Sequence, residues 1–297
     1  MVLRVTRFLP FLLVAGCSAA PSFMPHDTGP PPAGAVGRDG GRVDRLFFAV
    51  TGDTRPAECD AGDRYPRATF SRIASSMRAL GVQFALDLGD HMFVCSGSQA
   101  EAQRQMGMYL AAIAEGPATF WMTMGNHECG SASSGGGCSV GDGDANFAAY
   151  LSALGRPRPW YANDVSTSRG LARFVVIADD AWNSEQAAWL EETLAAADAH
   201  ARYLVVARHH PLAGSRSGQR EIVATIARHR PTLVLSAHAH TYARDSERSV
   251  VVGLGGAPSS WPPGFATVLE TTDGALTFVL RDATGNPTGD AWSVLPP

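Results

Sequence analysis

The stretch TLVLSAHAHTYAR, residues 232–244, joins a strand-like apolar run to two histidines one residue apart. In a β-strand, the side chains of residues i and i+2 point to the same side, so an extended backbone directs His238 and His240 toward one point. Two imidazoles that meet in this way can bind a metal ion together. The stretch therefore predicts a buried strand with part of a metal site at its carboxyl end.

Other short apolar runs, rich in β-branched or aromatic residues, occur along the chain. With the first one they span residues 46–53, 82–90, 118–126, 172–180, 203–210 and 232–240. Near-continuous apolar runs of this length are typical of strands buried on both faces. Helix-like stretches lie between them, at residues 67–80, 184–200 and 219–229. Alternating strands and helices predict a layered α/β fold.

The helical stretches show their expected buried faces and starts. The first places Phe70, Ile73, Met77 and Leu80 on one face, and the second has Ala188, Leu190 and Leu194 in its apolar part. Ser184 is the expected N-cap of the second helix. After residue 248 the pattern changes, and turn signals at Asp273-Gly274 and Thr284-Gly285 predict a closing antiparallel meander.

The apolar runs end in residue types that bind metal ions. These are Asp53, Asp90, Asn126, His209 with His210, and His238 with His240. Ligands of open α/β sheets bind beyond the carboxyl ends of the strands, so these ends converge on one rim if the strands are neighbours. Carboxylate, amide and imidazole ligands without thiolate favour Mn, Fe, Zn or Co over Cu(I). A shared carboxylate would place two ions about 3.5–4 Å apart. Asp179 and Asp180, which end the remaining run, are expected to be structural.

The N-terminus predicts export. Residues 1–16 contain two arginines and then an apolar run that is too short for a membrane anchor, as in a signal peptide. The sequence VAGC at residues 14–17 resembles the bacterial lipobox, which implies a lipid on Cys17 and a location at the bacterial cell envelope, in the periplasm or at the outer membrane. The alternative is a plain secretory signal with an incidental cysteine. Residues 17–44, rich in Pro, Gly and Ala, predict a flexible tether, and residues 45–297 predict one folded domain.

The remaining cysteines agree with export. Four cysteines allow three pairings, and we expect Cys129–Cys138 and Cys59–Cys95. The competing interpretation, a metal site, lacks CxxC spacing. The formal net charge is −4, and every basic residue is an arginine. This net negative charge does not indicate a surface that binds nucleic acid.

Several short motifs occur in an order that resembles one family. They are GD at residues 52–53, GD at 89–90, GNHE at 125–128, HHP at 209–211 and AHAH at 237–240. Together they resemble the calcineurin-like metallophosphoesterases, especially the purple acid phosphatase branch, over Leu46 to about Asp282. The resemblance implies a layered β-sandwich core flanked by helices. It also implies two divalent or mixed-valence transition-metal ions, such as Mn, Fe or Zn, at the C-terminal ends of strands, and a small phosphate ester as substrate.

The resemblance also implies a role for each matching residue. Asp90 would bridge both ions, Asp53 and His240 would hold the first ion, and Asn126, His209 and His238 would hold the second. His209 is preferred over His210 because the family's ligand lies two residues before the proline. His127 would contact the phosphate and assist the leaving group as acid or hydrogen-bond donor. Further candidate substrate contacts are Asn126, Arg55 and His210.

The sequence departs from the family pattern at three positions. Arg55 stands where many members have a histidine ligand, Phe93 replaces the tyrosine of the purple acid phosphatases, and Ala237 replaces a usual glycine. The first metal position is therefore one protein ligand short, with water as the expected substitute. His91, which follows the bridging aspartate, either faces the pocket or hydrogen-bonds nearby.

These features predict a lipid-tethered phosphomonoesterase in which a metal-bound hydroxide attacks phosphorus in line. Two alternatives remain open. One is a phosphodiesterase acting on nucleotides or lipid head groups. The other is a degenerate, non-catalytic binding lipoprotein, which the missing histidine and tyrosine ligands would favour.

Overall fold

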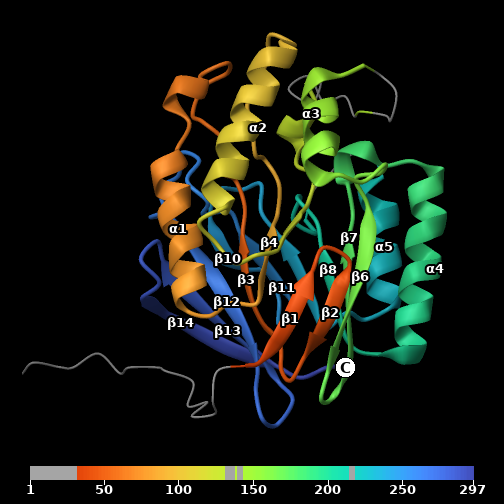
Figure 1. The fold of residues 1–297 in the computed structure, drawn as a ribbon. Coiled ribbons are helices and arrows are strands. Elements are labelled where there is room, and N and C mark those ends of the chain that lie inside the picture. Colours follow the sequence, from red (N-terminus) through yellow and green to blue (C-terminus); the bar gives the residue numbers. More distant parts are fainter. Residues whose placement is uncertain (1–31, 131–137, 139–142, 214–217) are drawn as a thin grey trace, which may run out of the picture.

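The computed structural model describes residues 32–130, 138, 143–213 and 218–297. Within these residues the chain forms two β-sheets that pack between two groups of helices (Figure 1). This arrangement confirms the predicted layered α/β sandwich. The expected signal peptide and Cys17 lie outside the described residues. None of the described helices combines the length and the apolar character that a membrane crossing requires.

The strands form one sheet of eight and one of six. The order in the first is β1 (Gly34–Gly37), β2 (Gly40–Val43), β6 (Tyr161–Thr167), β7 (Gly170–Val176), β8 (Ala201–Ala207), β9 (Leu233–Ser236), β11 (Ser249–Val252) and β10 (Tyr242–Arg244). The order in the second is β14 (Pro287–Val294), β13 (Leu276–Asp282), β12 (Gly264–Glu270), β3 (Phe47–Thr51), β4 (Phe84–Asp87) and β5 (Phe120–Met122).

The helices cover the outer faces of the two sheets. They are α1 (Arg67–Ala79), α2 (Gln99–Ile113), α3 (Ala145–Leu154), α4 (Ser184–His200) and α5 (Gln219–Arg228). Helices α1 to α3 pack on the six-stranded sheet, where Phe70 and Ile73 of α1 lie in one cluster with Ala49 of β3. Helices α4 and α5 pack on the eight-stranded sheet, where Leu190 and Ile222 lie in one cluster with the β7, β8 and β9 side chains.

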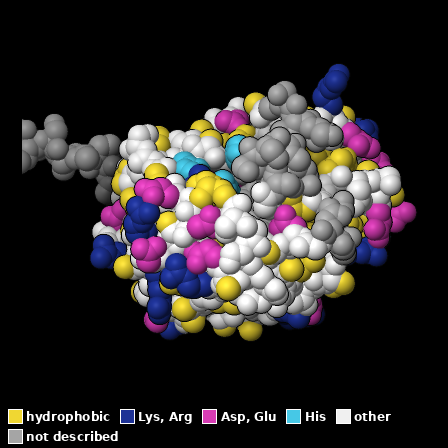
Figure 2. All heavy atoms as spheres, turned by 90° about the horizontal axis from the view of Figure 1, so that it is seen from above, with side chains coloured by type: hydrophobic (Ala, Val, Ile, Leu, Met, Phe, Trp, Pro, Cys, Tyr) yellow, Lys and Arg dark blue, Asp and Glu magenta, His cyan; other side chains and the backbone are white. Residues whose placement is uncertain are grey.

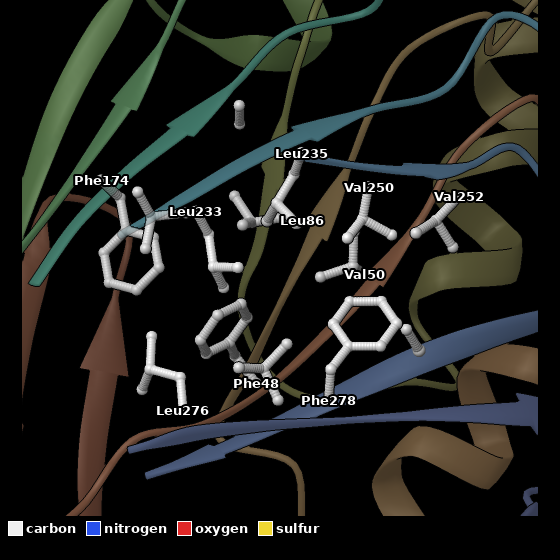
Figure 3. Close-up of a cluster of buried hydrophobic side chains, with 14 of the residues drawn as sticks. Phe48, Val50, Leu86, Phe174, Leu233, Leu235, Val250, Val252, Leu276 and Phe278 are labelled. Carbon is white, nitrogen blue, oxygen red and sulfur yellow. The ribbon is translucent and has the colours of Figure 1, made fainter. Parts of the chain in front are cut away.

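The largest apolar core lies between the sheets (Figure 3). Because side chains alternate along a strand, Phe48 and Val50 of β3 point into this core while Ala49 points to the helices. Phe48 packs edge-on against Phe174 of the opposite sheet, with 5.2 Å between the ring centroids. Each large side chain buried here stabilises the sandwich by about 1.5–3 kcal/mol. This core fixes the position of one sheet on the other.

Parallel pairing aligns the strand ends that carry the predicted ligands. Strands β3, β4 and β5 pair in parallel in one sheet, and β7, β8 and β9 pair in parallel in the other. The meander expected near the C-terminus is formed by β12, β13 and β14. The β11 run belongs instead to the eight-stranded sheet, where it pairs with β9.

Two details of the sequence interpretation were wrong. The expected tether of residues 17–44 contains β1 and β2, with Val36 and Val43 in the core. A glycine-rich composition suggested flexibility, yet glycine is required here, because a Cβ at Gly40 would lie 2.1 Å from the carbonyl oxygen of Asp164 on β6. The N-cap of α4 is Asn183 instead of Ser184, since its side chain accepts a hydrogen bond from the Gln186 N–H.

Candidate metal centre

The predicted ligands meet where the carboxyl ends of both sheets come together. Asp53, Asp90 and Asn126 follow β3, β4 and β5, whereas His209 follows β8 and the two histidines of the opening stretch follow β9. The rim is thus shared between two sheets, which differs from the single sheet edge that the strand pattern suggested. Figure 2 views the molecule from this end and shows histidine side chains gathered at the surface.

The backbone bends sharply at four of these residues. Asp53, Asp90, His238 and His240 have φ values of 60°, 61°, 67° and 50°. Left-handed backbone is uncommon for residues other than glycine and is found at functional sites, where the surrounding structure holds it. In the described residues, Asp60 and Arg230 are the other non-glycine positions with positive φ. Strand β9 ends at Ser236, so His238 and His240 do not lie in the extended backbone that the sequence pattern suggested.

Asn126, His209 and His238 surround the second predicted position. Asn126 Oδ1 lies 3.0 Å from His209 Nε2 and 2.9 Å from His238 Nδ1, and the two ring nitrogens lie 3.2 Å apart. Asp90 Oδ1 lies 3.3 Å from the same His209 nitrogen. Ligands bound to one ion at about 2.0–2.2 Å have spacings of this size. His209 Nδ1 donates to the Leu88 carbonyl at 2.7 Å, which leaves Nε2 directed at this position.

Asp53, Asp90 and His240 surround the first predicted position, with ligand atoms within 4.8 Å of one another. His240 Nε2 lies 3.8 Å from Asp53 Oδ1, and His240 Nδ1 donates to the Pro258 carbonyl at 2.8 Å. Both Asp53 oxygens are buried, and neither has a hydrogen-bond partner among the residues that the structure describes. Burial, opposed in part by the charge of His209, raises the pKa of Asp53 to about 8. A buried carboxylate of this kind fits a bound cation, which would compensate its charge.

Asp90 lies between the two positions. Its Oδ1 faces His209, whereas its Oδ2 lies 3.6 Å from Arg55 Nε and 3.8 Å from His127 Nε2. Burial acts to raise the pKa of Asp90, but the charges and hydrogen bonds of His209 and His127 hold it well below its usual range. The ionised carboxylate is therefore suited to share its two oxygens between two cations.

His127 lies at the open edge of this cluster. Its backbone N–H donates to Asp90 Oδ1 at 3.0 Å, and its half-buried ring packs on Phe93 with 4.3 Å between centroids. Burial lowers the pKa of His127, so its ring favours the neutral form. The side chain borders the predicted positions, from where it can reach a substrate.

Arg55, a predicted substrate contact, is largely buried. Its Nη2 lies 3.4 Å from His240 Nε2, and its guanidinium carbon lies 4.6 Å from the centre of the Phe93 ring. His210, the other additional contact, has its Nε2 2.9 Å from Asp180 Oδ2, and its ring contacts that of His238. Arg55 therefore borders the first position, and His210 borders the second.

Asp179 and Asp180 have structural partners, as expected. Asp179 Oδ2 accepts the backbone N–H of His210 at 3.0 Å, and its Oδ1 lies 3.0 Å from Nη2 of the fully buried Arg208. These contacts hold the segment that carries His209 and His210.

Sequence reasoning missed the buried charges that support the ligands. Glu128 accepts hydrogen bonds from the backbone N–H groups of Asp90, His91 and Gly125 at 2.9, 2.7 and 2.6 Å. His91 is fully buried and lies 3.3 Å from both Glu128 and Asp87. Burial acts to lower the pKa of His91, but these carboxylates raise it to about 10. His91 therefore supports the Asp90 loop and does not face the pocket. The available signal in the sequence was the acidic residue Glu128, two positions after the predicted ligand Asn126.

Both expected disulfides are present. Cys59 pairs with Cys95, and Cys129 pairs with Cys138, with Cα–Cα distances of 5.5 and 5.6 Å. The first joins the loop after β3 to the loop after β4, which carry Asp53 and Asp90. The pairing agrees with an exported protein, since disulfides persist in oxidising compartments.

Comparisons with known proteins agree with this geometry. No curated protein matches the chain in sequence. Among solved structures, a purple acid phosphatase from yellow lupin (Lupinus luteus) has a TM-score of 0.63 at 16% identity, covering 84% of this chain and 54% of that chain. This protein therefore spans about half the length of the lupin phosphatase chain.

Two further solved structures share the fold. The anchor protein of the inner membrane complex of Plasmodium has a TM-score of 0.60 at 14% identity, covering 85% of this chain and 89% of that chain. A dimetal phosphatase from Danio rerio has a TM-score of 0.57 at 14% identity, covering 85% and 99%. The calcineurin-like phosphoesterase family model matches residues 48–242, which include all the predicted ligands. The chain thus belongs to the calcineurin-like phosphoesterase family, hydrolases that act on phosphoric ester bonds.

Proposed function

We propose that this metal-dependent phosphoesterase is a phosphomonoesterase that hydrolyses small phosphate esters with two transition-metal ions, such as Mn, Fe or Zn. One observation carries the proposal. Side chains from five strand ends surround two adjoining positions that share the carboxylate of Asp90. A shared carboxylate between two cation positions is the arrangement expected for in-line displacement at phosphorus.

Bound ions supply positive charge that activates a water nucleophile and neutralises the phosphoryl oxygens. Asp90 would hold both ions, because its carboxylate lies beside His209 of the second position and belongs to the Asp53–His240 cluster of the first. His127, at the open edge, donates a hydrogen bond to the leaving oxygen and stabilises the alkoxide that develops there. Asn126 lies beside it and orients the phosphate.

Charge near the centre favours monoesters over diesters. A monoester dianion carries more negative charge than a diester, so it gains more from a cationic side chain next to the ions. Arg55 is such a side chain, because its guanidinium lies close to Asp90 and His240. His210, whose ring contacts that of His238, supplies a further contact to the substrate.

The test is turnover by purified protein loaded separately with Mn, Zn, Fe or Co. We expect hydrolysis of para-nitrophenyl phosphate with a higher kcat/KM than that of the bis ester, and loss of both activities in Asp90→Asn. Faster cleavage of the bis ester would indicate a phosphodiesterase. Absence of turnover with every metal would indicate a non-catalytic binding protein.

We further propose that the protein is exported and anchored to the bacterial envelope through lipid on Cys17. The lipobox-like VAGC and the disulfides support this proposal. Expression of the full chain in a bacterium that processes lipoproteins should place it in the detergent-soluble membrane fraction, and Cys17→Ala should abolish this. Wild-type protein free in the periplasm would instead indicate a plain secretory signal.

A further inference from the structure

Arg55 lies close to two of the atoms that a first metal ion would need. Its Nε is 3.6 Å from Asp90 Oδ2, and its Nη2 is 3.4 Å from His240 Nε2. Only 14% of the side chain is exposed, so the guanidinium belongs to the site interior. The guanidinium and an ion would therefore use the same carboxylate oxygen and the same imidazole nitrogen.

The position is built to hold a cation. Asp53 is fully buried, and within the described part of the chain neither of its oxygens has a hydrogen-bond partner. Asp90 is buried beside it. An arginine keeps its charge under all ordinary conditions, so Arg55 brings a permanent positive charge to these two carboxylates. This charge repels a divalent ion that enters the same space.

Arg55 is held at this place by its own contacts. Its Nη1 donates to the Pro56 carbonyl at 3.0 Å, and its guanidinium carbon lies 4.6 Å from the centre of the Phe93 ring. An aromatic face attracts a guanidinium by a cation–π interaction. Arg55 and Phe93 are the two departures from the family's ligand pattern, and the structure places them in contact. The Phe93 ring therefore helps to hold the Arg55 guanidinium in place.

The second position has no comparable competitor in the described residues. Asn126, His209 and His238 contact one another there, and Asp90 Oδ1 completes the set. The contacts of Arg55 are with Oδ2 of Asp90, on the other side of the carboxylate.

We propose that Arg55 is a built-in cation at the first metal position, so that the protein binds one metal ion tightly at the second position and another only weakly. This inference rests on the proposed metal centre. A single bound ion would then leave less negative charge uncompensated at the site, because the guanidinium compensates part of the charge of Asp53 and Asp90.

The test is Mn²⁺ binding to metal-free protein, measured by calorimetry and by electron paramagnetic resonance. The wild type should bind one Mn²⁺ tightly and give the spectrum of an isolated ion. Arg55→Gln removes the charge without adding a ligand and should strengthen the weaker binding about 10- to 100-fold, the usual effect of groups around a metal site. Arg55→His also adds a ligand and should yield two ions with a spin-coupled spectrum.

Arg72→Gln provides the matched control, because Arg72 is exposed on α1 and its loss should leave both affinities unchanged. Two tightly bound, spin-coupled ions in the wild type would overturn the role of Arg55 and leave the metal centre intact. The role of Arg55 would also be overturned if Arg55→Gln bound the second, weaker Mn²⁺ with the same affinity as the wild type. No tight Mn²⁺ in any of these variants would instead overturn the metal centre itself, and the inference with it.

Discussion

Glu128 Oε2 accepts the backbone N–H of Asp90 at 2.9 Å, and it accepts the N–H of Gly125 at 2.6 Å. One buried carboxylate thus ties the loop after β4, which carries the bridging aspartate, to the loop after β5, which carries Asn126. His91 lies against the other carboxylate oxygen, at 3.3 Å. The alignment of the two loops depends on a residue that binds neither ion nor substrate.

Glu128→Gln should therefore damage both folding and metal binding. It leaves the buried His91 with one fewer anionic partner, and breaking a buried ion pair costs about 3–5 kcal/mol. Urea unfolding should show a loss of this order, and metal affinity should fall about 10- to 100-fold. Glu115→Gln, at an exposed residue after α2, is the control and should change neither quantity. If Glu128→Gln is as stable as the wild type, Glu128 does not hold the loops after β4 and β5 together.

His127→Ala should retain metal and lose turnover. The ring donates to the leaving group in the proposed reaction, and removal of such a group reduces kcat by about 10²- to 10⁴-fold. Metal content and kcat should be measured on the same preparation, with the exposed His200→Ala as control. A variant that loses its ion would show that His127 is a ligand.

Asp53→Asn should stabilise the metal-free protein at alkaline pH. Burial raises the folded-state pKa of Asp53 to about 8, from 3.8. The stability that the protonated Asp53 carboxyl contributes is fully present below pH 3.8 and is lost as the pH rises through about 8. At pH 9 the metal-free wild type carries a buried negative charge on Asp53 that Arg55 compensates only in part, and we expect the variant to be more stable by about 3 kcal/mol.

The comparison requires denaturant unfolding of chelator-treated protein between pH 4 and pH 9. The gap between Asp53→Asn and wild type should widen with pH, whereas the exposed Asp245→Asn should track the wild type throughout. Asparagine tolerates the left-handed backbone at this position, so the substitution adds no strain. If the variant is less stable than the wild type at pH 9, the buried charge of Asp53 does not destabilise the metal-free protein, which contradicts the role of Asp53 in cation binding.

The two disulfides should differ in their contribution to stability. Cys59 and Cys95 are 36 residues apart, whereas Cys129 and Cys138 are 9 apart. In the chain-entropy description the longer loop contributes about 4 kcal/mol and the shorter about 3 kcal/mol. The paired Cys→Ser variants should follow this order in urea unfolding. Replacing Cys59 and Cys95 should also weaken metal binding, because that bridge joins the loops of Asp53 and Asp90.

The ligand-bearing strand ends could be predicted from the sequence because each buried strand stops at a polar residue that has no reason to lie in an apolar run. Asp53, Asp90 and His209 stand out in this way, and parallel pairing brings them to one end of the sandwich. The disulfide pairing was predictable for a similar reason, since Cys59 and Cys95 both follow such strands.

Other features depend on partners that are distant in the sequence, so local composition and periodicity do not predict them. Strands β1 and β2 have the composition of a linker, but β2 pairs with β6 and β1 pairs with β2. The role of His91 is set by Asp87 and Glu128, and Glu128 lies on a different loop. Composition describes a segment by itself, whereas these features arise only when remote segments pack together.

The division of the ligands between the sheets has a mechanical consequence. Asp90 and Asn126 follow strands of the six-stranded sheet, and His209 and His238 follow strands of the eight-stranded sheet. An ion held by all four would cross-link the two sheets at the rim of the sandwich, whereas the apolar core holds the sheets together below it. Separation of the two sheets at this end would then require release of the ion. Amide hydrogen exchange in β4 and in β8 should therefore both be slower in the metal-bound protein than in the metal-free protein.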